Sequence, residues 1–228
     1  MGILPAKQSG SQSKMKPMKI QSHDRYRLTM IIGGIALFII FFFIGTFFYP
    51  GGSNFDVHTS GYRWNYNYWC ELLGEYAKNG QPNEARPFGF VGMISLAFGV
   101  SCFWYFIPKK IFQEGTLRHI SSFAGVLSMI LSAFIFTDLH DEVIYAAVIS
   151  GTLSFVTLFY GLFKLGKRGL FYAGIVCLSL ILLNCFIYLT EIGIGYLPSL
   201  QKFTFLLTLL WISRISFVLS TSTIGNRI

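Results

Sequence analysis

The sequence predicts an all-α membrane protein: a six-transmembrane-helix bundle with both termini cytoplasmic and a helix lying on its outer face. The composition indicates the membrane class, because 53% of the 228 residues are hydrophobic and only 12% are Asp, Glu, Lys or Arg. A soluble domain carries about 25% charged residues, so this chain has too few to cover a surface in water. The composition therefore excludes a soluble globular enzyme, a disordered chain and a fibrous protein.

Six apolar stretches are long enough to cross a bilayer. A span needs about 20 mostly apolar residues, and it must be helical because lipid offers no partner to an unpaired backbone group. The predicted spans are Leu28–Phe48, Phe88–Ile107, Ile120–Thr137, Val143–Phe163, Leu170–Thr190 and Phe203–Leu219. They form one membrane domain at 28–220 with a long outer loop at 49–87. A disordered basic arm (1–27) precedes it and a short tail (221–228) follows, both in the cytoplasm.

The basic residues indicate the orientation of these helices. Lys and Arg are enriched in cytoplasmic loops beside membrane spans. Most of the 18 Lys and Arg residues fall before the first span, between the second and third, between the fourth and fifth, or around the end of the sixth. The exceptions are Arg63, Lys78, Arg86 and Lys202. Both termini are therefore predicted to be cytoplasmic, and because this topology accounts for the net charge of +8, no nucleic-acid partner is expected.

The acidic residues gather on the opposite side of the membrane. Of the ten Asp and Glu residues, only Asp24 and Glu114 fall on the predicted cytoplasmic side. Asp and Glu contribute little to topology, so their clustering needs another explanation. It indicates that any chemistry lies on the outer face.

The long outer loop predicts a helix at the membrane surface. Aromatic and apolar residues recur at helical spacing and would share one face: Tyr62, Tyr66, Trp69, Leu73 and Tyr76. Trp and Tyr favour the headgroup region, where a ring is apolar at one end and hydrated at the other. We expect a helix lying on or dipping into the outer leaflet; the alternative is a helix that only caps the bundle.

Four residues of this loop are candidate lipid or ligand contacts: Arg86, Trp69, Tyr66 and Glu71. Trp69 and Tyr66 lie on the predicted aromatic face, whereas Glu71 points away from it. Arg86 stands at the outer boundary of the second span, where its planar guanidinium could hold a lipid phosphate or a carboxylate. Arg at an interface is also a common anchor. The expected partners are membrane lipids or another membrane protein.

The turn joining the third and fourth spans carries the densest set of polar side chains, Thr137-Asp138-Leu139-His140-Asp141-Glu142. If the outer loop folds over this turn, Asp56 and His58 would meet His140 and Asp141. Two imidazoles and two carboxylates suit a divalent metal such as zinc with an open coordination position. Without a metal, His58 or His140 is a candidate general base beside Asp141. The alternative is a solvated helix–helix corner.

The predicted spans contain few polar side chains. Asn184 is expected to bond to a neighbouring helix or to line a cavity, and Arg214 lies near enough to the cytoplasmic end to reach the headgroups. A carrier coupled to protons or ions needs ionisable groups at mid-depth, so the sequence argues against transport. Six glycines in the predicted spans are expected to let helices approach closely: Gly33, Gly34, Gly92, Gly99, Gly151 and Gly161.

The layout resembles an uncharacterised prokaryotic family of six-helix integral membrane proteins, classified as a domain of unknown function. The shared features, over about residues 28–220, are Tyr49-Pro50-Gly51-Gly52, an outer segment ending in Glu71-Leu72-Leu73-Gly74, and the polar turn after the third span. The resemblance implies a plasma (inner) membrane location and no particular reaction. The Asp–His turn is also loosely similar to membrane hydrolases of the alkaline ceramidase and receptor type. Those bind zinc through several His and an Asp, including a His-x3-His pair that this sequence lacks.

Two functional hypotheses follow from these patterns. In the first, the protein binds a lipid or a partner protein at its outer face and catalyses nothing. In the second, it is a metal-dependent hydrolase or transferase acting on a lipid-like substrate in the outer leaflet. Asp56, His58, His140 and Asp141 would then be ligands or base, with Arg86 as a headgroup clamp. The base rates of such features favour the first hypothesis.

Overall fold

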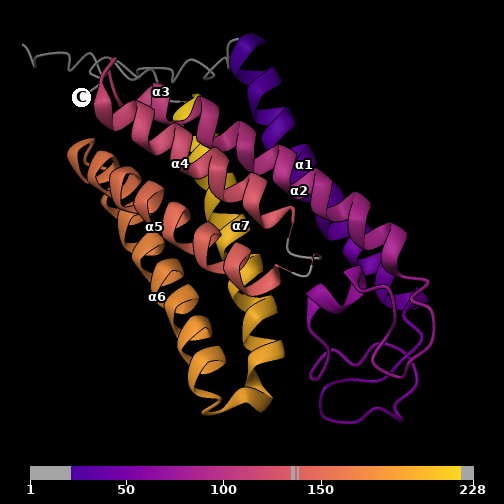
Figure 1. The fold of residues 1–228 in the computed structure, drawn as a ribbon. Helices are drawn as coiled ribbons and strands as arrows, with labels where there is room; N and C mark the ends of the chain where they lie inside the picture. The colour runs from indigo at the N-terminus through magenta and orange to yellow at the C-terminus, as the bar shows by residue number, and fades with distance from the viewer. Residues whose placement is uncertain (1–21, 135–136, 138, 222–228) are drawn as a thin grey trace, which may run out of the picture.

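The computed structural model describes residues 22–134, 137 and 139–221 (Figure 1). Within these ranges its regular secondary structure is helical, as the sequence predicts, and it has no β-strand beyond two isolated bridges. The elements are α1 (Ser22–Phe48), η1 (Trp69–Leu73), α2 (Arg86–Phe106), α3 (Pro108–Ile111), α4 (Thr116–Ser132), α5 (His140–Lys164), α6 (Arg168–Thr190), η2 (Ile194–Tyr196) and α7 (Leu197–Thr221). The first residues of the predicted arm and the last of the predicted tail, 1–21 and 222–228, lie outside the described residues.

Five helical segments in the described ranges are long and apolar enough to span a membrane. They are Ser22–Phe48, Arg86–Ile111, Glu142–Lys164, Arg168–Thr190 and Ile194–Thr221. The first starts at Ser22, inside the region expected to be a disordered arm. Asp24 in its first turn complements the positive end of the helix dipole, which favours this earlier start.

The third predicted span, Ile120–Thr137, corresponds to α4, which is shorter than expected. This helix has 17 residues and ends at Ser132, where the backbone tightens: the amide of Phe134 donates to the carbonyl of Leu131 at 2.9 Å. Two of its polar residues, Ser121 and Ser128, are buried. The hydroxyl of Ser128 donates to the carbonyl of Ala147 at 2.9 Å. The fold is therefore a multipass bundle with five apolar candidate spans in the described ranges, and six spans remain a prediction.

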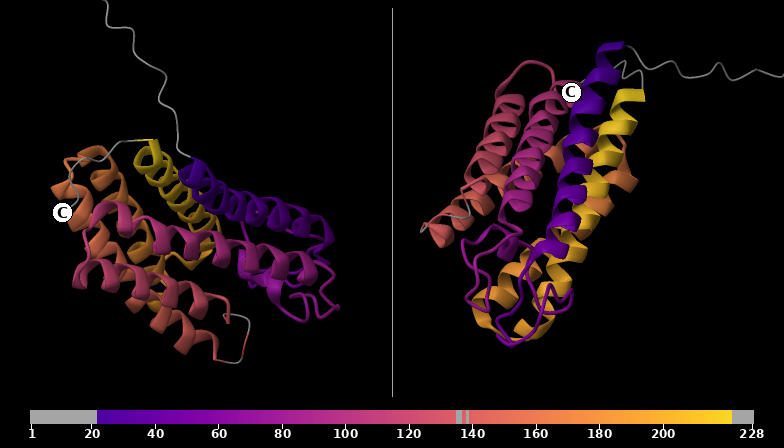
Figure 2. Two further views of the ribbon diagram at one scale, coloured as in Figure 1. Left: turned by 90° about the horizontal axis from the view of Figure 1, so that it is seen from above. Right: turned by 90° about the vertical axis from the view of Figure 1, so that its right-hand side faces the viewer.

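The helices alternate in direction, so that one end of the bundle gathers the start of α1, the short α3, the α5–α6 connection and the end of α7 (Figures 1 and 2). The segment between α1 and α2 and the turn between α6 and α7 lie toward the opposite end. In the view from above, α1 and α2 run side by side (Figure 2). The ends of the described chain thus lie at the same end of the bundle, which the predicted topology requires.

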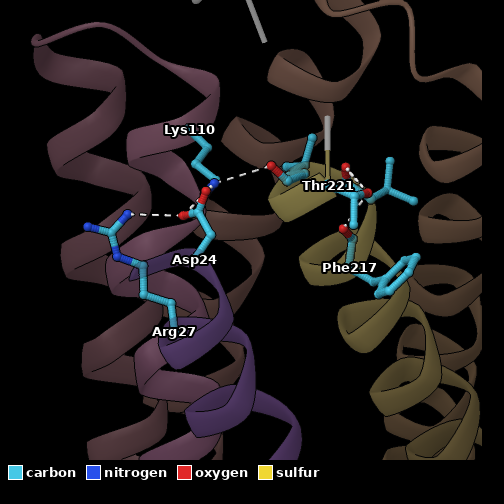
Figure 3. A network of polar contacts seen from close by, with 7 residues as sticks. Asp24, Arg27, Lys110, Phe217 and Thr221 are labelled. Atoms are coloured by element: carbon cyan, nitrogen blue, oxygen red, sulfur yellow. Dashed lines mark hydrogen bonds and ion pairs between the residues drawn. The ribbon is translucent and has the colours of Figure 1, made fainter. Parts of the chain in front are cut away.

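An ionic cluster ties three elements together at the α3 end (Figure 3). The ammonium of Lys110 lies 2.8 Å from a carboxylate oxygen of Asp24 and donates to the carbonyl of Leu219 at 3.3 Å. Arg27 reaches the same carboxylate at 3.3 Å. Because Asp24 belongs to α1, Lys110 to α3 and Leu219 to α7, the cluster joins both ends of the described chain to the turn after α2.

Close glycine packing holds α1 against α2. A Cβ on Gly34 would lie 2.6 Å from the Cα of Gly99, and a Cβ on Gly99 would lie 3.0 Å from the Cα of Gly34. The two backbones therefore touch, as small residues allow in membrane helices. Gly33, by contrast, has no atom of the described residues within 4 Å of its would-be Cβ, so the expectation of close approach holds for Gly34 and fails for Gly33.

These adjacent glycines give a matched pair of variants. Gly34→Ala is expected to lower the free energy of unfolding by about 1–3 kcal/mol, because two helix backbones must separate to admit the methyl group. Gly33→Ala, with open space above it, is expected to change it by less than about 1 kcal/mol. Unfolding of both variants by heat or SDS in the same detergent measures the difference, and equal losses would contradict the packing described.

Candidate functional site

The outer loop is a compact structure that closes one end of the bundle, and we call residues 49–85 the cap. The helix predicted across Tyr62–Tyr76 does not form; the helical part is η1, a five-residue 3-10 helix. The five residues expected on one face are divided. Trp69 and Leu73 are buried, whereas Tyr66 and Tyr76 are 50% and 62% exposed. The prediction of an extended interfacial helix was therefore wrong.

The side chain of Asn67 explains why no regular helix forms here. Its carbonyl oxygen accepts from the amide of Arg63 at 2.7 Å, and its amide nitrogen donates to the carbonyl of Gly52 at 2.6 Å. Asn is prone to such bonds, which compete with helical hydrogen bonding. The backbone amides of Tyr66 and Asn67 both donate to the carbonyl of Arg63, at 3.0 and 2.8 Å, and close a turn. Asn67 is fully buried and fixes this turn against the start of the cap.

A second asparagine, Asn83, fastens the last part of the cap to η1 and the residue that follows it. Its side-chain nitrogen donates to the carbonyls of Glu71 and Gly74, both at 2.9 Å. Its side-chain oxygen accepts from the amide of Ala85 at 3.2 Å. Asn83 is buried, so these bonds satisfy backbone groups that water does not reach.

Lys202, near the start of α7, extends its side chain into the cap. Its side-chain nitrogen donates to the carbonyl of Trp64 at 2.8 Å, to that of Asn67 at 2.5 Å and to that of Pro198 at 3.0 Å. The nitrogen also lies 5.5 Å from the centre of the Tyr62 ring. Lys202 is 6% exposed, and no carboxylate of the described residues forms an ion pair with it.

Glu71 is the acidic group of this buried network. It is 8% exposed, and one carboxylate oxygen accepts from the side-chain amide of Asn67 at 2.5 Å. The other oxygen has no hydrogen-bond partner among the described residues. Burial raises the pKa of Glu71, against the opposing effects of the Asn67 hydrogen bond and the charges of Lys78 and Lys202. Glu71 therefore lies inside the cap, and the lipid or ligand contact predicted for it remains a prediction.

Trp69 also lies inside, where it seals the cap against the helices. Its ring packs edge-on against Phe38 and Phe42 of α1, with centroids 5.5 and 5.8 Å apart. It makes a similar contact with Phe205 of α7 at 5.9 Å. The residue is 6% exposed. Trp69 thus packs the cap between α1 and α7, and the lipid or ligand contact predicted for it remains a prediction.

The exposed part of the turn forms an open hollow of about 320 Å³. It is lined by Tyr62, Arg63, Trp64, Asn65 and Tyr66. Burial raises the pKa of the Tyr62 hydroxyl, which stays a donor and bonds to the carbonyl of Asn67 at 3.1 Å. Of the four residues predicted to contact a lipid or ligand, Tyr66 is the one that is exposed at the surface. Arg86, the first residue of α2, is half-buried with its guanidinium 5.3 Å from the Phe90 ring centre.

The metal site predicted from Asp56, His58, His140 and Asp141 remains a prediction. Asp56 and His58 are exposed, and a carboxylate oxygen of Asp56 accepts from the backbone amide of His58 at 2.9 Å. The side chains of His140 and Asp141, and all of Asp138, lie outside the described residues. No group of three or more His, Cys, Asp or Glu side chains that could hold a metal ion occurs among those described.

Three of the residues that build the cap were missed by the sequence analysis: Asn67, Asn83 and Lys202. Only Lys202 gave a signal, as one of the four basic residues on the acidic side. The asparagines gave none, because a polar loop contains many and nothing marks those that turn inward. The bond expected from Asn184 is present, since its side-chain nitrogen donates to the hydroxyl of Thr204 on α7 at 2.8 Å.

Comparison with known proteins adds no assignment. No protein-family model matches the chain, and no curated protein or solved structure shows significant similarity to it.

The buried carboxyl of Glu71 predicts a pH-dependent stability. A raised pKa means that the folded protein holds this proton more tightly than the unfolded chain, in which the usual value is 4.5. The contribution of the protonated Glu71 carboxyl to the free energy of unfolding is full below pH 4.5. It is lost as the pH rises from there through the pKa of Glu71 in the folded protein. Glu71→Gln mimics the protonated acid and should remove this loss, on the order of 1 kcal/mol. Thermal unfolding in detergent between pH 4 and 8 measures it.

Glu75→Gln is the control for this experiment, because Glu75 is exposed on the same cap. It should keep the pH dependence of the wild type. Identical pH profiles for the wild type and Glu71→Gln would show that burial of this carboxyl does not contribute to stability.

Proposed function

We propose that this protein is a plasma-membrane protein that binds the headgroup of an anionic phospholipid of the outer leaflet through the hollow of its cap. Both termini would be cytoplasmic and the cap would face outward. The observation that carries the proposal is the position of Trp64. Its ring lies 6.1 Å from that of Phe43, an exposed residue of the apolar helix α1. The hollow is thus continuous with a surface that lipid would cover.

The distribution of charge supports the orientation. The α3 end of the bundle carries most of the basic residues that the structure describes, including Lys109, Lys110, Lys164 and Lys167. The cap carries four acids, Asp56, Glu71, Glu75 and Glu84, and only Arg63 and Lys78 as bases. Lys and Arg favour the cytoplasmic side of a membrane. This supports a cap outside the cell and an ionic cluster of Asp24 and Lys110 inside it.

The ring contacts support a position at the headgroups. Trp64 packs edge-on against Tyr62 at 5.5 Å and contacts Phe43, which in turn packs against Phe47 at 5.2 Å. Trp64 and Tyr66 are 45% and 50% exposed. Trp and Tyr concentrate where hydrocarbon meets headgroups, so this aromatic series would place the hollow at that depth.

Arg63 gives the hollow its chemistry. It is exposed, and its guanidinium has no hydrogen bond or ion pair in the part of the chain that the structure describes. A guanidinium binds phosphate through two parallel hydrogen bonds, and the side-chain amide of Asn65 offers a further donor. The combination of Arg, amide and flanking aromatics fits an anionic phospholipid headgroup. A protein partner or a metal-dependent reaction on a lipid-like substrate finds no comparable support among the described contacts.

Arg63→Ala tests the binding of lipid. Titration of delipidated protein with phosphatidylglycerol, followed by native mass spectrometry, should show affinity weakened by roughly tenfold, because one charge-assisted contact is lost. Lys78→Ala removes the other cationic side chain of the cap outside the hollow and should bind as the wild type does. Equal affinity in Arg63→Ala and the wild type would contradict the proposal.

The orientation has a separate test. Asn54→Cys places a thiol on the exposed cap, and Arg168→Cys places one at the exposed start of α6. A membrane-impermeant maleimide added to intact cells should label Asn54→Cys, and it should label Arg168→Cys only after permeabilisation. The unmodified chain gives the background from its own cysteines, and the reverse pattern would place the cap in the cytoplasm.

A further inference from the structure

Lys202 is bonded entirely to backbone carbonyls. Two of its acceptors, the carbonyls of Trp64 and Asn67, belong to the cap, and the third, that of Pro198, belongs to the preceding turn of α7. An ammonium has three N–H groups and no acceptor. All three donors are thus used, and two of them join α7 to a segment more than 130 positions earlier in the chain.

A buried cation with this arrangement is costly for stability alone. Removing an ammonium from water carries a large penalty, which backbone carbonyls offset only in part. An apolar side chain at position 202 would avoid that penalty, but it would leave the carbonyls of Trp64 and Asn67 without this donor beneath the cap. The interaction therefore fixes one conformation of the turn and does not simply add packing.

The two carbonyls that Lys202 holds flank the hollow. Trp64 lines it directly, and Asn67 closes the turn through the bonds of its own backbone and side chain to Arg63. The remaining polar contact between α7 and the cap in the described residues is weak: the amide of Trp69 donates to the side chain of Gln201 at 3.4 Å. Lys202 is thus the principal polar support of the hollow from α7.

We infer that Lys202 is the positioning residue of the cap: its ammonium holds the turn that presents Arg63 and Trp64 to a phospholipid headgroup. Lys202 is covered by the cap and does not itself touch the lipid. This inference rests on the proposed function for the identity of the ligand. The ordering of the turn by Lys202 follows from the hydrogen bonds alone and is measured independently.

The test combines hydrogen exchange with lipid titration in the full-length protein. Lys202→Met keeps the length of the side chain and removes its donors. It should accelerate exchange in the peptide containing the Tyr66 and Asn67 amides by on the order of tenfold or more, with the helices unchanged. Its affinity for phosphatidylglycerol should fall to about that of Arg63→Ala. Lys78→Met makes the same chemical change on the exposed surface of the cap and should alter neither quantity.

Two further substitutions separate positioning from general stability. Lys202→Arg retains several donors and should recover most of the exchange protection and lipid affinity. Lys202→Gln retains a single amide donor group and should give intermediate acceleration confined to residues 62–67. If Lys202→Met unfolds throughout, the exchange pattern of Lys202→Gln tests whether Lys202 positions the turn.

Several outcomes would overturn the inference. One is wild-type exchange at Tyr66 and Asn67 in Lys202→Met, or in Lys202→Gln if the Met variant unfolds. Another is a loss of exchange protection and lipid affinity in Lys202→Arg as large as the loss in Lys202→Met. A wild-type protein that does not bind phosphatidylglycerol, combined with confined loss of protection in Lys202→Met, would reject the lipid and retain Lys202 as the residue that orders the turn.

Discussion

The constraint behind this structure is that an irregular segment packed on apolar helices must find hydrogen-bond partners for its own backbone. Asn67, Asn83 and Lys202 meet that need in the cap. They bind the carbonyls of Gly52, Glu71, Gly74, Trp64 and Asn67, which regular helix or sheet would otherwise pair. The position of Trp69 between α1 and α7, and the shape of the surface hollow, depend on the loop conformation that these bonds fix.

The bundle could be predicted from sequence and the cap could not, for a physical reason. A membrane span is specified by a long apolar run, so α1, α2, α5, α6 and α7 overlap the predicted ranges, although α1 and α7 each begin six residues earlier than predicted. α4 is the exception, because it ends at Ser132, five residues before the predicted end of the third span. In the cap, the spacing of Tyr62, Tyr66 and Trp69 indicated a helix, but Asn67 bonds to the backbone and breaks it. Periodicity describes which residues could share a face, and it does not reveal a side chain that competes with the helix itself.

The two ends of the bundle are held by different physics. At the α3 end, Asp24 and Lys110 are partly exposed opposite charges, so salt screens their attraction. At the cap end, Lys202 is bonded to neutral carbonyls and is nearly inaccessible to solvent, and screening has little effect there. Ionic strength should therefore act on the end where α1, α3 and α7 meet and leave the cap intact. The α3 end is thus sensitive to ionic strength, whereas the cap end is not.

The sequence separation between the cap and Lys202 has a consequence for biogenesis. The bond from Lys202 to the carbonyl of Asn67 joins residues 135 positions apart, and a chain is synthesised and folded from its N-terminus. When α1 and α2 are already inserted, the cap between them still lacks its donor on α7. The carbonyls of Trp64 and Asn67 therefore lack the Lys202 ammonium, and stay hydrated, until α7 has been synthesised and packs against the cap. Completion of the cap is thus a late step in assembly. In a chain truncated before α7, this loop would be accessible to proteases.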